Sequence, residues 1–111
     1  MSSLPCQVGG DFNEIISPSE KWGGVKRQNS LMENFHESLD VCGLKDLGFL
    51  GSRFTWTNRH DSSHTVLERL DRCVSNVGWR QIFSKFVVKH LDFWNSDPRP
   101  IFLDFSVQQE R

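Results

Sequence analysis

The sequence has no tyrosine and no alanine, and only three of its 111 residues are cysteines. Cys6, Cys42 and Cys73 are an odd number and show no CxxC spacing. That pattern argues against a disulfide framework and against a zinc site. We therefore expect free thiols, buried or partly buried, in a reducing compartment.

Long hydrophobic runs and a strong charge imbalance are also missing. No stretch approaches the roughly 18 consecutive apolar residues of a membrane-spanning helix. The start of the chain, MSSLPCQVGGDF, has neither the basic leader nor the apolar segment of a secretory signal. We expect no membrane contact and an intracellular location, nuclear or cytoplasmic. With 13 Lys and Arg against 14 Asp and Glu, the net charge of −1 excludes affinity for nucleic acid through bulk charge alone.

What the sequence does contain favours one folded domain over residues 1–111. Single domains commonly have about 100–150 residues. Nine Phe and four Trp supply large side chains for a core.

The clearest predicted element is a helix that begins near Ser30. Ser30 and Glu33 have the spacing of a capping box, and Gly43 stands where a glycine ends a helix. Its apolar stripe is predicted to consist of Leu31, Phe35 and Leu39. The segment 17–30 before it, rich in Ser, Gly and charge, is typical of a long surface loop.

The remaining segments favour strands and one short helix. Residues 65–74 alternate and predict one strand with a core side and a side facing a cleft or water. A short helix is expected around Trp79. The other predicted features are the end of a strand at 7–12, a turn at 47–51, a β run at 54–57, a hairpin turn at 58–63, and strands at 86–88 and 101–103. The predicted class is α+β.

Three short clusters each contribute one aspartate. They are GDFN with Asp11, ERLDR with Asp71, and SDPRP with Asp97. Carboxylates that converge from separate strands suit magnesium, which prefers oxygen ligands. Each residue also has a structural interpretation: Asp11 as a turn former, Asp71 as the partner of Arg69 or Arg72, and Asp97 as an acceptor for loop amides.

The order of the motifs GDFN, FTW, RLDR and SD resembles the endonuclease/exonuclease/phosphatase superfamily, which is DNase I-like. Within it, the sequence is most similar to the endonuclease domain of plant non-LTR retrotransposon polyproteins, from about Gly9 to Val107. The resemblance implies the C-terminal half of a two-sheet β-sandwich flanked by helices. It also implies hydrolysis of a phosphodiester with Mg²⁺, and DNA as partner.

The same resemblance implies a role for four residues. Asp11 would orient or deprotonate the attacking water, and Asn13 would donate a hydrogen bond to a phosphate oxygen. Asp71 would orient a catalytic histidine. Asp97 would help to hold the metal.

One departure from the family pattern affects the chemistry directly. The family has Ser-Asp-His where this chain has Ser-Asp-Pro, so Pro98 stands in place of the histidine. Proline has no titratable group and no backbone N–H. His90 is expected to be a strand residue rather than a substitute. The other histidines, His36, His60 and His64, are expected to lie away from the site.

The second departure concerns the family's first half, which carries its main metal-binding glutamate. The chain begins just before GDFN, and neither Glu14 nor Glu20 can be assigned to that role. We therefore expect binding of Mg²⁺ to be doubtful and the chain to be inactive alone. A half-domain would also expose an apolar face and strand edges.

The sequence-based interpretation is a truncated, degenerate homologue of a magnesium-dependent endonuclease of retroelement type. One alternative is a nucleic-acid-binding remnant, because residues 45–89 contain 8 basic and 4 acidic side chains, an excess of 8 − 4 = +4. The other alternative is a nuclease half that a partner chain completes.

Overall fold

The computed structural model describes residues 4–58, 63–91 and 100–105 and has the predicted α+β class. Its elements, in chain order, are β1 (Gln7–Asp11), the 3-10 turn η1 (Pro18–Glu20), β2 (Lys21–Trp22), α1 (Asn29–Val41), β3 (Lys45–Asp46), β4 (Leu50–Gly51), β5 (Trp56–Thr57), β6 (Leu67–Glu68), β7 (Asp71–Ser75), α2 (Val77–Ile82), β8 (Val87–His90) and β9 (Ile101–Asp104). None of the helices among the described residues is long and apolar enough to cross a membrane.

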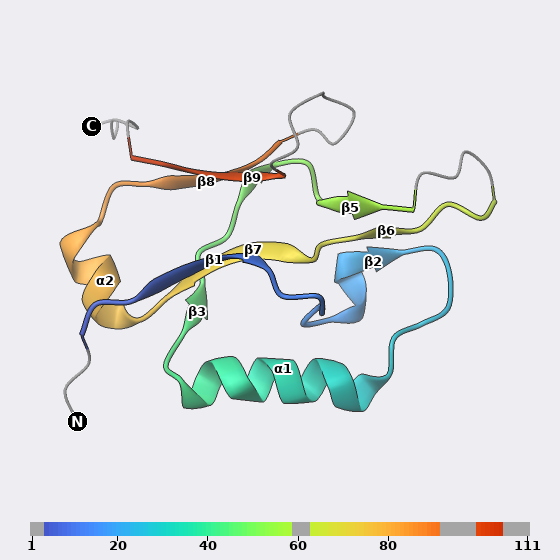
Figure 1. Cartoon of the computed structure of the whole chain (residues 1–111), viewed down its shortest axis with the longest axis horizontal. Coiled ribbons are helices and arrows are strands. Elements are labelled where there is room, and N and C mark those ends of the chain that lie inside the picture. The colour runs from blue at the N-terminus through green and yellow to red at the C-terminus, as the bar shows by residue number, and fades with distance from the viewer. Residues whose placement is uncertain (1–3, 59–62, 92–99, 106–111) are drawn as a thin grey trace.

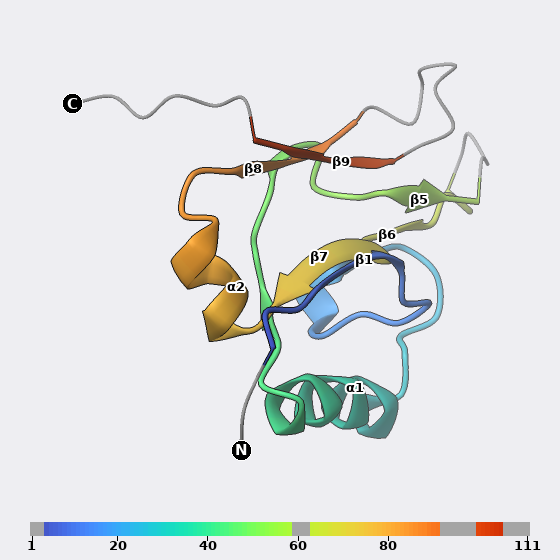
Figure 2. The same ribbon diagram turned by 60° about the vertical axis from the view of Figure 1, so that its left-hand side comes forward.

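The strands form three small sheets, in the orders β1-β7-β3, β2-β6-β5 and β4-β8-β9. Helix α1 lies on one side of the β1-β7-β3 sheet, and β8 and β9 lie on the other side (Figure 1). The same order of layers is visible after rotation (Figure 2). Strand β7 is therefore central, and its residues Arg72, Val74 and Ser75 are fully buried.

Strands β1 and β7 pair antiparallel over five residues, from Gln7 opposite Ser75 to Asp11 opposite Asp71. Gly9 lies opposite Cys73, and a Cβ added at Gly9 would come within 3.1 Å of the Cys73 Sγ. A glycine here lets the two strands meet over the buried thiol. The expected strand end at 7–12 is confirmed.

Helix α1 confirms the predicted element but not its start. It begins at Asn29 after Gln28, whose side chain makes no capping hydrogen bond, so the predicted Ser30 capping box is wrong. Its end is as predicted. Gly43 has φ +69°, the Gly43 amide donates to the Asp40 carbonyl, and the Leu44 amide donates to the Leu39 carbonyl, which is a Schellman ending.

The predicted apolar stripe of α1 is wrong by one position at its beginning. Met32 and Leu39 are buried and Phe35 is half-buried, whereas Leu31 is exposed. The stripe therefore follows positions i, i+3 and i+7, which also lie on one face of a helix. Phe35 contacts Phe12 at a ring-centroid distance of 5.6 Å, which places α1 against the end of β1.

The predicted single strand over residues 65–74 is in fact two strands, β6 and β7, in different sheets. The Arg69 amide donates to the Glu20 carbonyl (2.9 Å), and the Thr55 hydroxyl accepts from the Leu70 and Asp71 amides (3.0 and 3.1 Å). At the break between β6 and β7, these acceptors take the place of hydrogen bonds to a neighbouring strand, because buried amides need partners. The side expected to face a cleft or water is not open to solvent, since Arg69 and Cys73 on it are buried and Asp71 is half-buried.

The segment 17–30 is not the plain surface loop that its composition predicts. It contains η1 and β2, and β2 pairs with β6. Its Glu20 is half-buried and accepts hydrogen bonds from two arginines of the central strands. The segment therefore contributes to the interior of the molecule.

The central interaction of the fold is a buried ion-pair network of Arg69, Arg72, Glu20 and Asp46. Arg72 donates to Glu20 (2.6 Å) and Asp46 (2.8 Å), and Arg69 donates to Glu20 (2.9 Å) and Asp46 (2.9 Å). The Arg72 side chain has no exposed surface, and that of Arg69 is 7% exposed. Phe35 lies under the Arg72 guanidinium and Phe49 under that of Arg69.

Opposing effects act on the two carboxylates of this network. Burial alone would raise the pKa of Glu20 and of Asp46. The hydrogen bonds and positive charges of the two arginines outweigh burial, so both pKa values lie below their usual range. Both carboxylates are therefore ionised in the folded protein at neutral pH.

The apolar core is small. A cluster of Ile15, Met32 and Leu70 joins the segment after β1, helix α1 and the β6–β7 break. Eight apolar residues among those described are buried, whereas thirteen large ones are exposed, including Phe102 and Phe105 on and after β9. The ion-pair network therefore occupies central space that side chains of a larger apolar core would otherwise fill.

The C-terminal elements agree with the sequence prediction. Asn76 caps the start of helix α2: its side chain accepts from the Trp79 amide (3.0 Å), and Trp79 is buried. Strands β8 and β9 pair antiparallel. The thiols are free, but only Cys73 is buried; the prediction is wrong for Cys6 and Cys42, which are exposed.

We predict that Arg72→Met destabilises the protein by about 3–5 kcal/mol, since removing one partner leaves buried charge uncompensated. Arg53→Met is the matched control, because Arg53 is exposed, and its guanidinium donates to the Ser19 carbonyl (2.9 Å) and lies over the Phe54 ring (5.4 Å to the centroid). This substitution should cost less than about 1 kcal/mol. Urea unfolding followed by circular dichroism measures both. Equal urea midpoints for the two variants would contradict a central role for the network.

Candidate functional site

Two of the predicted site residues, Asp11 and Asp71, lie directly opposite each other at the end of the β1-β7 ladder. Residues paired across an antiparallel ladder present their side chains to the same face of the sheet. The ladder continues for one bond beyond them, from the Phe12 amide to the Leu70 carbonyl (2.9 Å). Sixty positions apart in the sequence, the two carboxylates therefore meet at one sheet end.

Asp71 is held in place by Thr55. The buried Thr55 hydroxyl accepts from the Asp71 amide (3.1 Å) and is hydrogen-bonded to the Asp71 side chain. Burial raises the pKa of Asp71, the hydroxyl of Thr55 lowers it, and the negative charge of Asp11 raises it; the net result is a pKa above the usual range. Among the described residues, no cationic side chain forms an ion pair with Asp71.

Asn13 follows Asp11 in a tight turn. Its φ is +58°, a left-handed conformation that asparagine tolerates better than most residues. The Asn13 amide donates to the Asp11 Oδ1 (2.7 Å), so the turn-forming interpretation of Asp11 describes one of its contacts. Asp11 and Asn13 are both exposed, which leaves their remaining polar atoms open to solvent or a ligand.

The alternative in which Asp71 pairs with Arg69 or Arg72 is wrong. Both guanidinium groups are bound to Glu20 and Asp46. The break between β6 and β7 explains the difference, because Arg69 and Asp71 do not belong to one continuous strand.

The third predicted carboxylate, Asp97, lies outside the described residues, and so does Pro98. The structure therefore brings Asp11, Asn13 and Asp71 together and does not place Asp97. Among the histidines, His36 and His64 are exposed, and His60 lies outside the described residues.

His90 is a strand residue of β8, as predicted, and it is buried. Its Nδ1 is 2.7 Å from the Ser52 carbonyl oxygen, and its ring stacks on Phe49 at 4.0 Å. Burial lowers the pKa of His90, and the charge of Arg69 contributes in the same direction. His90 is therefore held in the interior by these contacts. It lies in the β4-β8-β9 sheet, whereas the carboxylate pair lies in the β1-β7-β3 sheet.

Asp11 and Asp71 provide oxygen ligands of the kind that a divalent cation prefers. Mg²⁺ is often held by one or two carboxylates, with water and substrate phosphate completing six oxygen ligands. Asp11 and Asp71 supply two carboxylates, and their mutual repulsion is what a cation would relieve. Within the described part of the chain, no three His, Cys, Asp or Glu side chains gather as a metal-binding group. These residues fit a cation shared with a phosphate, not a closed protein cage.

The excess of basic residues over positions 45–89 does not form one external surface. Arg69 and Arg72 are buried in the ion-pair network, and Lys89 is paired with Asp104 (3.0 Å). Arg80 donates to the Ser75 carbonyl (2.8 Å). The sequence count of +4 therefore overstates the charge available to a polyanion.

Sequence reasoning missed Thr55, Glu20 and Asp46. Thr55 was part of the FTW motif, and a Thr directly before an aromatic residue of a predicted β run was the available signal. Nothing in the spacing of Glu20 and Asp46 indicated that they approach Arg69 and Arg72 from separate segments.

We predict that Asp11→Asn lowers the pKa of Asp71 towards the usual aspartate value of 3.8, because the substitution removes a nearby negative charge. Carboxyl carbon NMR titration measures the shift. Asp40→Asn, an exposed substitution of the same type on α1, is the control and should leave the titration of Asp71 unchanged. If Asp71 titrates identically in the wild type and in Asp11→Asn, the two carboxylates are not electrostatically coupled.

No protein-family model, curated protein or solved structure matches this chain, so the residues and their geometry carry the functional argument.

Proposed function

We propose that the chain is a degenerate relative of magnesium-dependent, DNase I-like endonucleases of retroelement type, and that it is catalytically inactive alone. The observation that carries the proposal is the pairing of Asp11 with Asp71. It joins the GDFN and RLDR motifs on neighbouring strands, with Asn13 in the adjoining turn. The stacking of the β1-β7-β3 and β4-β8-β9 sheets supports a sandwich-like parent fold.

Asp11, Asn13 and Asp71 each have a chemical role in this proposal. The exposed Asp11 carboxylate can accept a hydrogen bond from water and orient it towards a phosphorus atom. The Asn13 side-chain amide can donate to a phosphate oxygen as negative charge develops there. With Pro98 in place of the histidine that Asp71 would orient, Asp71 would join Asp11 as a ligand of a bound Mg²⁺, and the ion would neutralise the phosphate.

The proposed loss of activity follows from Pro98. Proline can neither donate nor accept a proton, and it cannot contact a phosphate through an N–H. His90 is buried against Phe49 and bonded to Ser52, so it cannot move to the carboxylate pair without disrupting the interior. Asp71 then has no imidazole to orient.

The two alternatives differ in their support. A nucleic-acid-binding remnant would need an accessible basic surface, and burial of Arg69 and Arg72 removes part of it. A nuclease half completed by a partner chain is favoured by exposed apolar side chains such as Ile82, Phe83 and Phe105. The proposed partner is DNA, bound with weak, salt-sensitive affinity.

We predict that the purified chain does not nick supercoiled plasmid DNA in Mg²⁺ or Mn²⁺, since the acid–base histidine is replaced by Pro98. Gel electrophoresis over several hours measures nicking, with Asp11→Asn as the control for contaminating nucleases. Metal-dependent nicking that is present in the wild type and lost in Asp11→Asn would overturn the proposed inactivity.

We also predict that Pro98→His alone does not restore cleavage. Residues that act as a unit are strongly non-additive, so the return of one member returns little. Asp11 and Asp71 repel each other, and neither Glu14 nor Glu20 can be assigned as the family's main metal-binding glutamate. The same plasmid assay compares wild type, Pro98→His, and the double variant Pro98→His with Asp11→Asn. Cleavage by Pro98→His that disappears in the double variant would show that this chain already holds every other catalytic group.

A further inference from the structure

His90 is a buried histidine of β8 that the proposed function leaves without a role. It is 4% exposed, and by strand alternation its side chain shares one face of the β4-β8-β9 sheet with Val88, which is 2% exposed. This buried face is the one turned towards the β1-β7-β3 sheet (Figure 1). A histidine at this position can change its charge near neutral pH in a place that water does not reach.

The imidazole of His90 is the end of a stack of three side chains. Its ring lies 4.0 Å from that of Phe49, centroid to centroid, and the two planes differ by 4°. The guanidinium carbon of Arg69 lies 4.6 Å from the same Phe49 centroid. Because His90 covers one face of the Phe49 ring, Arg69 lies over the other face. The stack therefore joins β8 to the ion-pair network through the connection between β3 and β4.

The hydrogen bonding of His90 suits a neutral ring. The Ser52 carbonyl can only accept, so the Nδ1 atom of His90 donates to it (2.7 Å) and the Nε2 atom of the neutral ring carries the lone pair. Nε2 is buried, and among the described residues it has no hydrogen-bond partner. A proton added at Nε2 would therefore be a buried donor without an acceptor, which is costly.

Three charged side chains of the ion-pair network act on His90. Arg69 and Arg72 oppose a positive charge on the ring, and Asp46 favours one. Both oxygens of Asp46 are already in use: Oδ1 accepts from Arg69 and from the Gly48 amide (2.9 Å each), and Oδ2 accepts from Arg72 (2.8 Å). Asp46 could accept from a protonated His90 only by giving up a bond that stabilises the network.

The strands on either side of β8 offer no compensating charge. Gly51 of β4 and Ile101 of β9 lie opposite His90, and neither has an ionisable side chain. Lys89, the neighbour of His90 on β8, projects from the other face of the sheet and is paired with Asp104 (3.0 Å).

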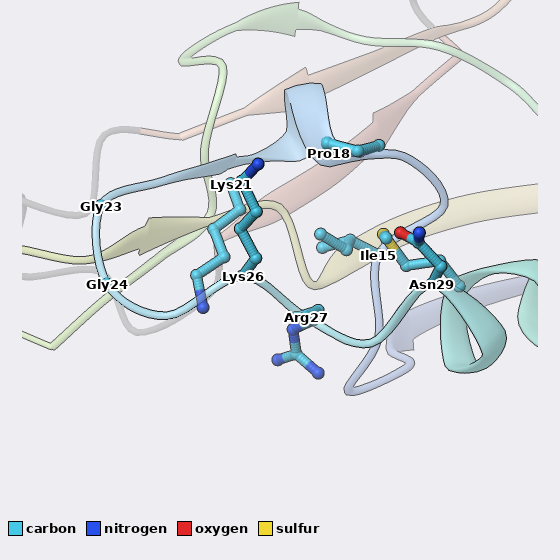
Figure 3. Close-up of a pocket in the computed structure, with 9 residues that line it drawn as sticks. Ile15, Pro18, Lys21, Gly23, Gly24, Lys26, Arg27 and Asn29 are labelled. Carbon is cyan, nitrogen blue, oxygen red and sulfur yellow. The ribbon is translucent and has the colours of Figure 1, made fainter.

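Other ionisable groups near the network are either neutral or bound elsewhere. On β7, burial raises the pKa of Cys73 and keeps its thiol neutral, and the side chain of Asp71 is hydrogen-bonded to Thr55. Three further cations line a basic cavity beside the start of α1 (Figure 3), namely Lys21, Lys26 and Arg27. Helix α1 and β8 lie on opposite sides of the β1-β7-β3 sheet (Figure 1). His90 therefore titrates against the charges of the ion-pair network.

We propose that His90 is a pH-sensitive latch between the two layers. As a neutral imidazole it holds the β4-β8-β9 sheet against the β1-β7-β3 sheet through Phe49 and Ser52. Its protonation places a second cation against Phe49 and creates a buried donor without an acceptor. The β4-β8-β9 sheet then separates from the central sheet at mildly acid pH and uncovers the apolar face that contains Val88.

The direction of the pH effect follows from the environment of the ring. Burial lowers the pKa of His90 below its usual value of 6.5, against the opposing effect of the hydrogen bond to Ser52. Between the folded and the unfolded pKa, the unfolded chain binds a proton that the folded chain does not. Stability is therefore complete above pH 6.5 and is lost as the pH falls from there towards the folded pKa.

The first experiment is urea unfolding of the full chain at pH 7.5 and 5.5, followed by circular dichroism. A group with a pKa of 6.5 that is protonated only in the unfolded chain raises the unfolding equilibrium constant about tenfold over this range, or about 1.4 kcal/mol. His90→Phe keeps a ring on Phe49 but cannot take up a proton, so its unfolding constant should change less than about threefold. His36→Asn removes an exposed histidine of α1 and is the matched control, which should retain the tenfold change.

Hydrogen exchange of the wild-type chain, measured by NMR, shows which part opens. Between pH 7.5 and 5.5 the protection factors of amides in β8 and β9 should fall about tenfold. At pH 5.5 they should lie below those of the central strand β7, because the β4-β8-β9 sheet opens while the β1-β7 ladder stays intact. Should His90→Phe fail to fold, these exchange data decide alone.

Three results would each overturn the latch: a tenfold change in the unfolding constant that persists in His90→Phe, equal protection of β8 and β7 at pH 5.5, or protection of β8 and β9 that does not change with pH. None of these measurements involves DNA or a metal ion. Their outcome is therefore independent of the proposed endonuclease relationship.

Discussion

The fold depends on the ion-pair network that Arg69 and Arg72 form with Glu20 and Asp46. Two arginines on and beside the central strand would be prohibitively costly to bury alone, and each carboxylate compensates both of them. The network joins η1, β3 and β7, three segments that the small apolar core does not connect by itself. Its geometry therefore fixes where the segment after β1 runs, and with it both the carboxylate pair and the basic cavity.

The effects on the pKa of Asp71 balance in the opposite direction to those on the carboxylates of the ion-pair network. In the network, hydrogen bonds and positive charge outweigh burial, so the pKa values of Glu20 and Asp46 are lowered. These carboxylates contribute stability above their unfolded pKa values, and the contribution is lost as the pH falls through the folded values. For Asp71, burial and the charge of Asp11 outweigh the hydrogen bond with Thr55, so the pKa is raised. Its contribution is present at low pH and is lost as the pH rises through the folded value. The carboxylates of Asp11 and Asp71 therefore repel each other, whereas the charges of the ion-pair network compensate one another.

The sequence predicted the parts that depend on local chemistry. Gly43 ends α1, a short helix contains Trp79, and the strands β1, β8 and β9 lie where apolar runs indicate them. It did not predict the break at Leu70, because the acceptor for the amides there is the Thr55 hydroxyl, which arrives from another strand. Nor could it predict that Glu20 lies inside, since a charged residue in a Ser- and Gly-rich segment normally faces water.

The motif RLDR shows how much of the site depends on these non-local contacts. Arg69 and Arg72 flank Asp71 in sequence, and on a continuous strand Arg69 would share its face. The strand breaks between them, and both guanidinium groups turn to Glu20 and Asp46. Asp71 is left facing Asp11, and within the described part of the chain the hydroxyl of Thr55 is the partner of its side chain. Within the described part of the chain, a proton on one carboxylate or a bound cation would relieve this repulsion. The network that stabilises the molecule thereby takes up the two arginines that flank Asp71 in the sequence.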